Sequence, residues 1–114
     1  MTFDEVRQIA LSFPEVEEYN LFGSPAFRIR KRLLTTIAKI DPDTLMVRVP
    51  NQLEREFLLS TKPEIYYSTE HYAAYNSLLV RIPVADPEEL RELLEDAWMS
   101  FAPKRLVAKY QSEK

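Results

Sequence analysis

The sequence predicts an α+β fold in which helices from both ends of the chain cover one face of an antiparallel sheet. Apolar residues near both ends recur at the three- and four-residue spacing of amphipathic helices. The segments between them alternate apolar and polar residues, which is typical of strands with one buried face. The chain has 114 residues, 46% of them hydrophobic, which is the size of one domain with one core. We therefore expect a single two-layer domain over residues 1–114.

The N-terminal segment "FDEVRQIALSF" is predicted to be a helix. Thr2 followed by Glu5 has the spacing of a capping box, in which each side chain accepts a hydrogen bond from the backbone of the other residue. Pro14 disfavours helical backbone in the residue before it, so the helix ends there. The connection that follows is expected to hold a short strand around residues 19–22. Gly23 is interpreted as a turn residue, because a phosphate-binding loop needs several glycines and this chain has one.

Three segments, "AFRIR", "RLLTTIAKI" and "LMVRV", are predicted strands. The first two are expected to form a hairpin across Lys31 and Arg32. Phe27 and Ile29 alternate with arginines, so the apolar side chains are expected to face the core and the arginines to face away from it. The segment "DPDT" then predicts a turn, because proline fixes φ and aspartate side chains bond to nearby backbone.

The segment "QLEREFLLST" is predicted to be a second helix, with Asn51 as its N-cap and Leu53, Phe57 and Leu58 facing the core. A short strand is expected at Ile65–Ser68, followed by a loop. The segment "LLVRIPV" is predicted to be a further strand, because it again alternates apolar residues with an arginine.

A long helix is predicted from Pro87, with Asp86 as its N-cap. Its apolar stripe consists of Leu90, Leu93, Leu94, Ala97, Trp98 and Phe101. The acidic residues on its other side are interpreted as a solvated face, favoured in the first turn by the helix dipole. Pro103 ends this helix, and "KRLVAKY" is expected to add one or two final helical turns.

The cations are unevenly distributed, although the net charge is −3 and a dedicated duplex-binding domain more often has a pI above about 9. Residues 21–39 contain no acidic residue. The polar positions of the predicted strands would share the sheet face away from the helices, and their cations are Arg28, Arg30, Arg48 and Arg81. With the turn Lys31–Arg32 they form a candidate site for the phosphates of DNA. The alternative, favoured by the acidic net charge, is a solvated face in which arginine stems cover apolar surface.

A second candidate site is the tyrosine-rich segment around the single histidine of the chain. With neighbouring arginines it forms a hypothetical pocket for a protein partner or a small anion, made of Tyr67, His71, Tyr72 and Tyr75. No enzyme chemistry is evident, because the chain has no cysteine and its serines lack a nucleophile-elbow pattern. We therefore expect no catalytic residue, no cofactor and no bound metal.

The sequence also indicates in which cellular compartment the protein is located. No apolar run approaches the roughly 20 residues that a membrane-spanning helix needs. The first residues include acids where a signal peptide has cations, and the absence of cysteine fits a reducing compartment. We expect a cytoplasmic monomer without membrane contact.

Four blocks in this order resemble the MmcQ/YjbR-like family of small bacterial proteins: "FPEVEE", "FGSPAFRIR", "HYAAYNSLLVRI" and "LLEDAWMSFAPKRL". The resemblance covers nearly the whole chain. It implies a two-layer domain similar to the frataxin-like fold, and members are described as DNA-binding through a winged β-hairpin. On the matching residues it implies phosphate contact by the hairpin residues Arg28, Arg30, Lys31 and Arg32 and by the C-terminal pair Lys104 and Arg105. We assign no iron site to the acidic residues of the long helix.

Overall fold

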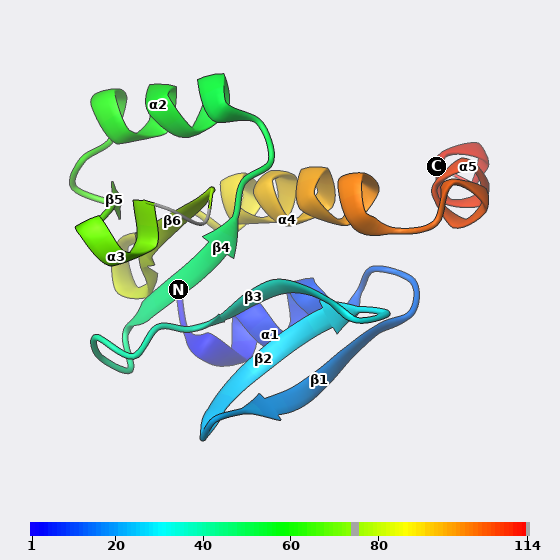
Figure 1. Ribbon diagram of the computed structural model, residues 1–114, viewed down its shortest axis with the longest axis horizontal. Helices are drawn as coiled ribbons and strands as arrows, with labels where there is room; N and C mark the ends of the chain where they lie inside the picture. Colours follow the sequence, from blue (N-terminus) through cyan, green and yellow to red (C-terminus); the bar gives the residue numbers. More distant parts are fainter. Residues whose placement is uncertain (74–75, 114) are drawn as a thin grey trace.

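The computed structural model describes residues 1–73 and 76–113. Within these residues six strands form one antiparallel sheet, in the order β1-β2-β3-β4-β6-β5 (Figure 1). The strands are β1 (Val16–Leu21), β2 (Ser24–Ile29), β3 (Arg32–Ile37), β4 (Thr44–Arg48), β5 (Tyr66–Tyr67) and β6 (Ser77–Arg81). The predicted α+β class is confirmed.

Helices cover mainly one face of this sheet. The helices of the described residues are α1 (Phe3–Leu11), α2 (Gln52–Thr61), α3 (Glu70–Ala73), α4 (Pro87–Phe101) and α5 (Lys104–Ser112), with a 3-10 turn, η1, at Ile82–Val84. Helices α1 and α4 pack against each other and against the strands (Figure 1). Short helix α3 lies on the opposite face, where Tyr72 packs on Met46 and Leu79. We call this opposite side the open face.

Two tight hairpins set the register of β1, β2 and β3. The β1–β2 turn consists of Phe22 and Gly23, whose φ angles of 51° and 90° are those of a type I′ turn. The β2–β3 turn consists of Arg30 and Lys31, one residue earlier than predicted, because Ile29 pairs with Arg32. Arg30 has a φ of 59° and therefore lies outside the strand in which the sequence placed it.

A β-bulge between β2 and β3 interrupts the alternation of side chains. Phe27 pairs with Thr35, whereas Arg28 pairs with Leu33, so Leu34 is the extra residue. Leu34 and Thr35 are consequently both buried, although they are neighbours in sequence. The bulge thus buries two successive side chains of β3, one apolar and one polar.

The core lies between the sheet and the pair α1 and α4. The predicted alternation is confirmed at Phe27 and Ile29 in β2, which are fully buried. The predicted apolar stripe of α4 is buried as well, apart from Phe101, which is half-buried. Trp98 has no exposed surface, and its ring packs on that of Phe13 with centroids 6.3 Å apart.

The orientation predicted for α2 is wrong in part. Leu58 is buried, but Leu53 and Phe57 are 78% and 54% exposed. Arg55 is buried instead, and its Nε donates a hydrogen bond of 2.8 Å to the carbonyl oxygen of Ser77 at the start of β6. Residues two positions before and after Arg55 lie roughly opposite it on a helix, so this hydrogen bond turns Leu53 and Phe57 outward.

Other boundaries differ from the prediction by a few residues. The strand expected at 19–22 is the longer β1, and the strand expected at Ile65–Ser68 is the two-residue β5. The loop expected after it contains α3, and the final helical turns extend to Ser112. None of the helices in the described part of the chain combines the length and apolar composition that a membrane crossing requires.

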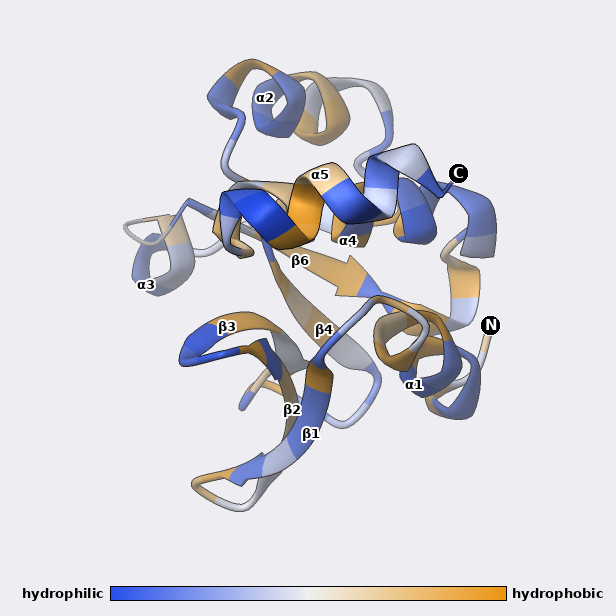
Figure 2. Cartoon of the chain, turned by 90° about the vertical axis from the view of Figure 1, so that its right-hand side faces the viewer, coloured by the Kyte–Doolittle hydropathy of each residue, from blue (hydrophilic) through white to orange (hydrophobic). Residues whose placement is uncertain are grey.

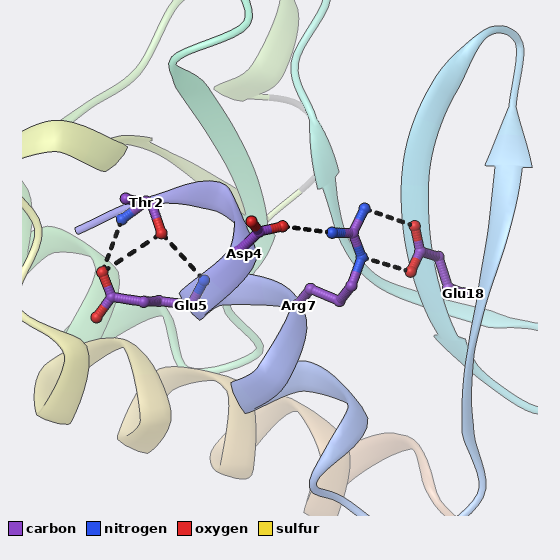
Figure 3. Close-up of polar contacts among 5 residues, drawn as sticks. All are labelled: Thr2, Asp4, Glu5, Arg7 and Glu18. Carbon is purple, nitrogen blue, oxygen red and sulfur yellow. Dashed lines mark hydrogen bonds and ion pairs between the residues drawn. The ribbon is translucent and has the colours of Figure 1, made fainter.

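Polar contacts fix the start of α1 and join it to β1 (Figure 3). Thr2 and Glu5 form the predicted capping box. The guanidinium of Arg7 donates hydrogen bonds of 2.9 and 3.3 Å to the two carboxylate oxygens of Glu18, and one of 2.6 Å to Asp4. The hydrogen bond to Glu18 is the main reason that the pKa of Arg7 is raised. These contacts hold the outer strand β1 against α1.

Candidate nucleic-acid interface

Cations from two distant parts of the chain meet on one side of the molecule. Arg30 in the β2–β3 turn and Arg105 and Lys109 in α5 line the same hollow, with a volume of about 610 Å³. We define the basic edge as these three residues and their neighbours in sequence: Arg30, Lys31, Arg32, Lys104, Arg105 and Lys109. All six residues are exposed. In Figure 2 the first turn of α5 is blue, the colour of hydrophilic residues.

An aromatic contact brings the hairpin close to α5. The guanidinium carbon of Arg32 lies 4.5 Å from the centroid of the Phe101 ring, which is a cation–π distance. Phe101 is the last residue of α4, and α5 begins at Lys104. Figure 1 shows α5 just beyond the end of α4. The contact therefore places the start of β3 beside the start of α5.

Tyr110 anchors α5 to α4. Its ring centroid lies 4.8 Å from that of Trp98, and its hydroxyl donates a hydrogen bond of 2.5 Å to Glu95. Desolvation, assisted by this hydrogen bond and by the charge of Glu95, raises the pKa of Tyr110 to about 12. The hydroxyl thus keeps its proton at neutral pH. Leu106 and Val107 also pack against the core, which leaves the cations of α5 exposed.

One carboxylate moderates the charge of the basic edge. Glu15 is the single acid lining this hollow among the described residues, and its carboxylate lies 2.9 Å from Nη2 of Arg30. Both side chains are about half exposed, so water screens the ion pair strongly and its net contribution to stability is small. Arg30 therefore remains accessible to a competing anion.

Two of the other predicted cations have local partners. Arg28 donates a hydrogen bond of 2.7 Å to Glu17 and lies over the Tyr19 ring at 4.1 Å. Arg81 lies over the Tyr67 ring at 4.1 Å and donates to the carbonyl oxygen of Pro63 at 3.1 Å. These contacts hold each arginine against its own neighbours and away from the basic edge.

Arg48 has a different position again. It is half-buried at the end of β4 and lines a separate hollow on the open face, while its guanidinium carbon lies 5.8 Å from the centroid of the Phe101 ring. The eight residues predicted to contact phosphates therefore divide: five lie on the basic edge, and Arg28 and Arg81 do not. Arg48 shares the Phe101 ring with Arg32 but lines the hollow on the open face. Sequence reasoning missed Lys109, although its spacing of four residues from Arg105 places both on one side of a helix.

Among the described residues of the predicted second site, Tyr67 lines a different hollow from His71 and Tyr72. Tyr67 lies with Arg81 and contacts Thr44 through hydroxyl groups 3.3 Å apart. His71 and Tyr72 line the hollow that contains Arg48, and their rings meet edge to face at 4.9 Å. Tyr75 lies outside the described residues.

Two serines close to the histidine segment make structural hydrogen bonds. Ser68 accepts a hydrogen bond of 3.0 Å from Arg55, and the hydroxyl of Ser77 donates to the carbonyl oxygen of Tyr72. Both serines thus have structural partners. No group of three or more His, Asp or Glu side chains in residues 1–73 and 76–113 is arranged to hold a metal ion.

These features define a small α+β domain with one antiparallel sheet, two helices on one face, an open face and a basic edge. The chain belongs to the YjbR family, whose model matches residues 11–100. A Deinococcus radiodurans protein with a domain described as DUF419 has the same fold, with a TM-score of 0.73 and 20% identity over 87% of this chain and 77% of that one.

Curated relatives are similar over part of the chain. Uncharacterized proteins of Mycobacterium bovis and of two Mycobacterium tuberculosis strains are each 35% identical over 65 residues. The match covers 57% of this chain and 50% of each relative. The chain therefore spans about half the length of the curated relatives it matches.

Proposed function

We propose that the basic edge binds the phosphate backbone of duplex DNA. The observation that carries this proposal is the convergence of Arg30, Arg105 and Lys109 on one hollow from segments more than 70 residues apart in sequence. Cations spread over a turn and a helix offer separate contacts to successive phosphates, and each contact releases condensed counterions. The description of MmcQ/YjbR-like proteins as DNA-binding is consistent with this role.

The rest of the molecule makes the binding weak. The net charge of −3 repels DNA at long range, so the affinity depends on the local charge of the basic edge. The interaction therefore requires low or moderate salt. We expect the logarithm of the binding constant to fall with the logarithm of salt concentration, with a slope of about −3 for three or four phosphate contacts.

Fluorescence anisotropy with a labelled DNA duplex tests the proposal at about 50 mM and about 150 mM salt. A triple variant, Lys31→Gln, Lys104→Gln and Arg105→Gln, should weaken binding at least about tenfold at the lower salt and flatten the slope. The matched control is Arg28→Gln, Arg81→Gln and Arg91→Gln, which changes the net charge equally at other places.

The two triple variants separate the basic edge from a general charge effect. Retained affinity in the control, with loss in the basic-edge variant, supports the proposal. An equal loss in both variants would mean that net charge alone matters. The absence of salt-sensitive affinity in the unaltered chain would refute DNA binding altogether.

A further inference from the structure

The open face of the sheet contains a second hollow, separate from the basic edge. It has a volume of about 400 Å³ and lies among the β1–β2 turn, strands β3 and β4, and α3. Leu33, Met46 and Tyr72 give it apolar surface, and Phe22 lies at the β1–β2 turn. The volume is within the range of about 300–1,000 Å³ that is usual for small-molecule sites.

The charged residues of this hollow are cationic. Arg48 and Lys39 line it, and no carboxylate does so among the described residues. The ammonium of Lys39 donates a hydrogen bond of 2.8 Å to the carbonyl oxygen of Phe22, which uses one of its three donors. A small anion entering the hollow would thus meet two positive charges and no nearby lining acid.

Arg48 also has an unsatisfied donor. Its Nε is buried and has no hydrogen-bond acceptor in the part of the chain that the structure describes. A buried donor without an acceptor is costly, and nearly all such groups in folded proteins are paired. The other strand arginines differ, because Arg28 donates to Glu17 and Arg81 donates to the carbonyl oxygen of Pro63. Arg48 is therefore not simply one more solvated arginine of the sheet.

We propose that this hollow binds a small apolar carboxylic acid. Its carboxylate pairs with the guanidinium of Arg48, which lines the hollow, while Lys39 adds a second positive charge. Its ring or short chain covers Leu33, Met46 and Tyr72. A carboxylate fits because the planar fork of arginine matches its two oxygens. This proposal is independent of DNA binding, because it concerns a different hollow and different residues.

Titration with naphthoate, followed by proton–nitrogen correlation NMR spectra of the full chain, tests the proposal. We expect saturable shifts concentrated at Leu33, Met46 and Tyr72, with a Kd of about 1 mM or tighter. Naphthamide, which has the same rings without the charge, should bind at least about tenfold more weakly. No saturable shift, shifts confined to other residues, or equal affinity for the acid and the amide would overturn the proposal.

Variants identify the groups that bind the probe. Arg48→Gln should weaken naphthoate binding at least about tenfold and leave naphthamide nearly unaffected, whereas Arg81→Gln is the matched control and should change neither. Leu33→Trp should fill the hollow and weaken the binding of both probes.

Lys39→Gln, at an exposed position, should weaken naphthoate binding severalfold. It provides the test of charge if Arg48→Gln fails to fold. The assignment would be contradicted if a folded Arg48→Gln chain bound naphthoate with unchanged affinity. If Arg48→Gln is unfolded, unchanged affinity in Lys39→Gln would contradict it.

Discussion

The indole nitrogen of Trp98 donates a hydrogen bond of 3.0 Å to the carbonyl oxygen of Pro14, which joins α4 to the connection between α1 and β1. Trp98 has no exposed surface, and its ring also packs on Tyr110 of α5. One residue therefore links the core, the N-terminal connection and the helix that presents half of the basic edge.

Replacing Trp98 by phenylalanine should lower the free energy of unfolding by about 2–4 kcal/mol. The smaller ring leaves a cavity, and the carbonyl oxygen of Pro14 loses its donor. Urea denaturation followed by circular dichroism measures this loss. Leu53→Ala is the control, because Leu53 is 78% exposed, and it should change stability by less than about 0.5 kcal/mol. A small effect of Trp98→Phe would contradict the linking role of the indole.

The β1–β2 turn should be sensitive at Gly23 and tolerant at Phe22. Gly23 has a φ of 90°, and a Cβ there meets no atom within 4 Å, so the cost of Gly23→Ala is backbone strain alone. We expect a loss of about 1 kcal/mol in thermal or urea unfolding. Phe22→Asn should preserve or raise stability, because asparagine tolerates a φ of 51° better. Equal effects of the two substitutions would rule out strain as the cause.

Glu54 on α2 should give stability a measurable pH dependence. Partial burial raises the pKa of Glu54, and the negative charges of Asp96 and Glu92 raise it further. The folded protein therefore binds this proton more tightly than the unfolded chain does. The Glu54 contribution to the unfolding free energy increases as the pH falls through the raised pKa, and it levels off below the unfolded pKa.

Glu54→Gln should consequently stabilise the protein at neutral pH, by about 0.5 kcal/mol after allowance for solvent screening. Its advantage over the unaltered chain should shrink as the pH falls. Urea midpoints measured between about pH 7 and about pH 4 provide the comparison. Glu56→Gln on the same helix is the control. It leaves the Glu54–Asp96 pair intact, so the contribution of Glu54 to the unfolding free energy should still increase as the pH falls. An advantage that is constant with pH would show that the Glu54 proton is not its source.

Removing Glu15 should strengthen DNA binding if the basic edge is the site. Glu15→Gln releases Arg30 from its ion pair, so one further cation is available to a phosphate, and anisotropy at low salt should show about threefold higher affinity. Glu17→Gln releases Arg28 in the same way but outside the basic edge. It should leave the affinity nearly unchanged. An equal gain from both substitutions would argue against a localised site.

Local patterns in the sequence account for most of the elements and part of the core. The capping box at Thr2 and Glu5, the N-cap at Asn51 and the apolar stripe that contains Trp98 are local signals, and the structure confirms all three. The orientation of α2 is different, because it depends on the hydrogen bond from Arg55 to Ser77, which is 22 residues away in sequence. Periodicity alone contains no information on such a partner.

The sequence by itself determined the α+β class, the buried face of β2 and the turn at Gly23, because helix and strand periods and glycine conformation are properties of short segments. Only the tertiary structure decided which cations meet. Arg28, Arg30, Arg48 and Arg81 have similar positions in the strand pattern, yet the turn conformation of Arg30 directs it to α5, whereas Arg48 lines the open face. The positions of these cations depend on the strand order, on the β-bulge and on the packing of Phe101 against Arg32. Each of these features depends on contacts between residues that are far apart in the chain.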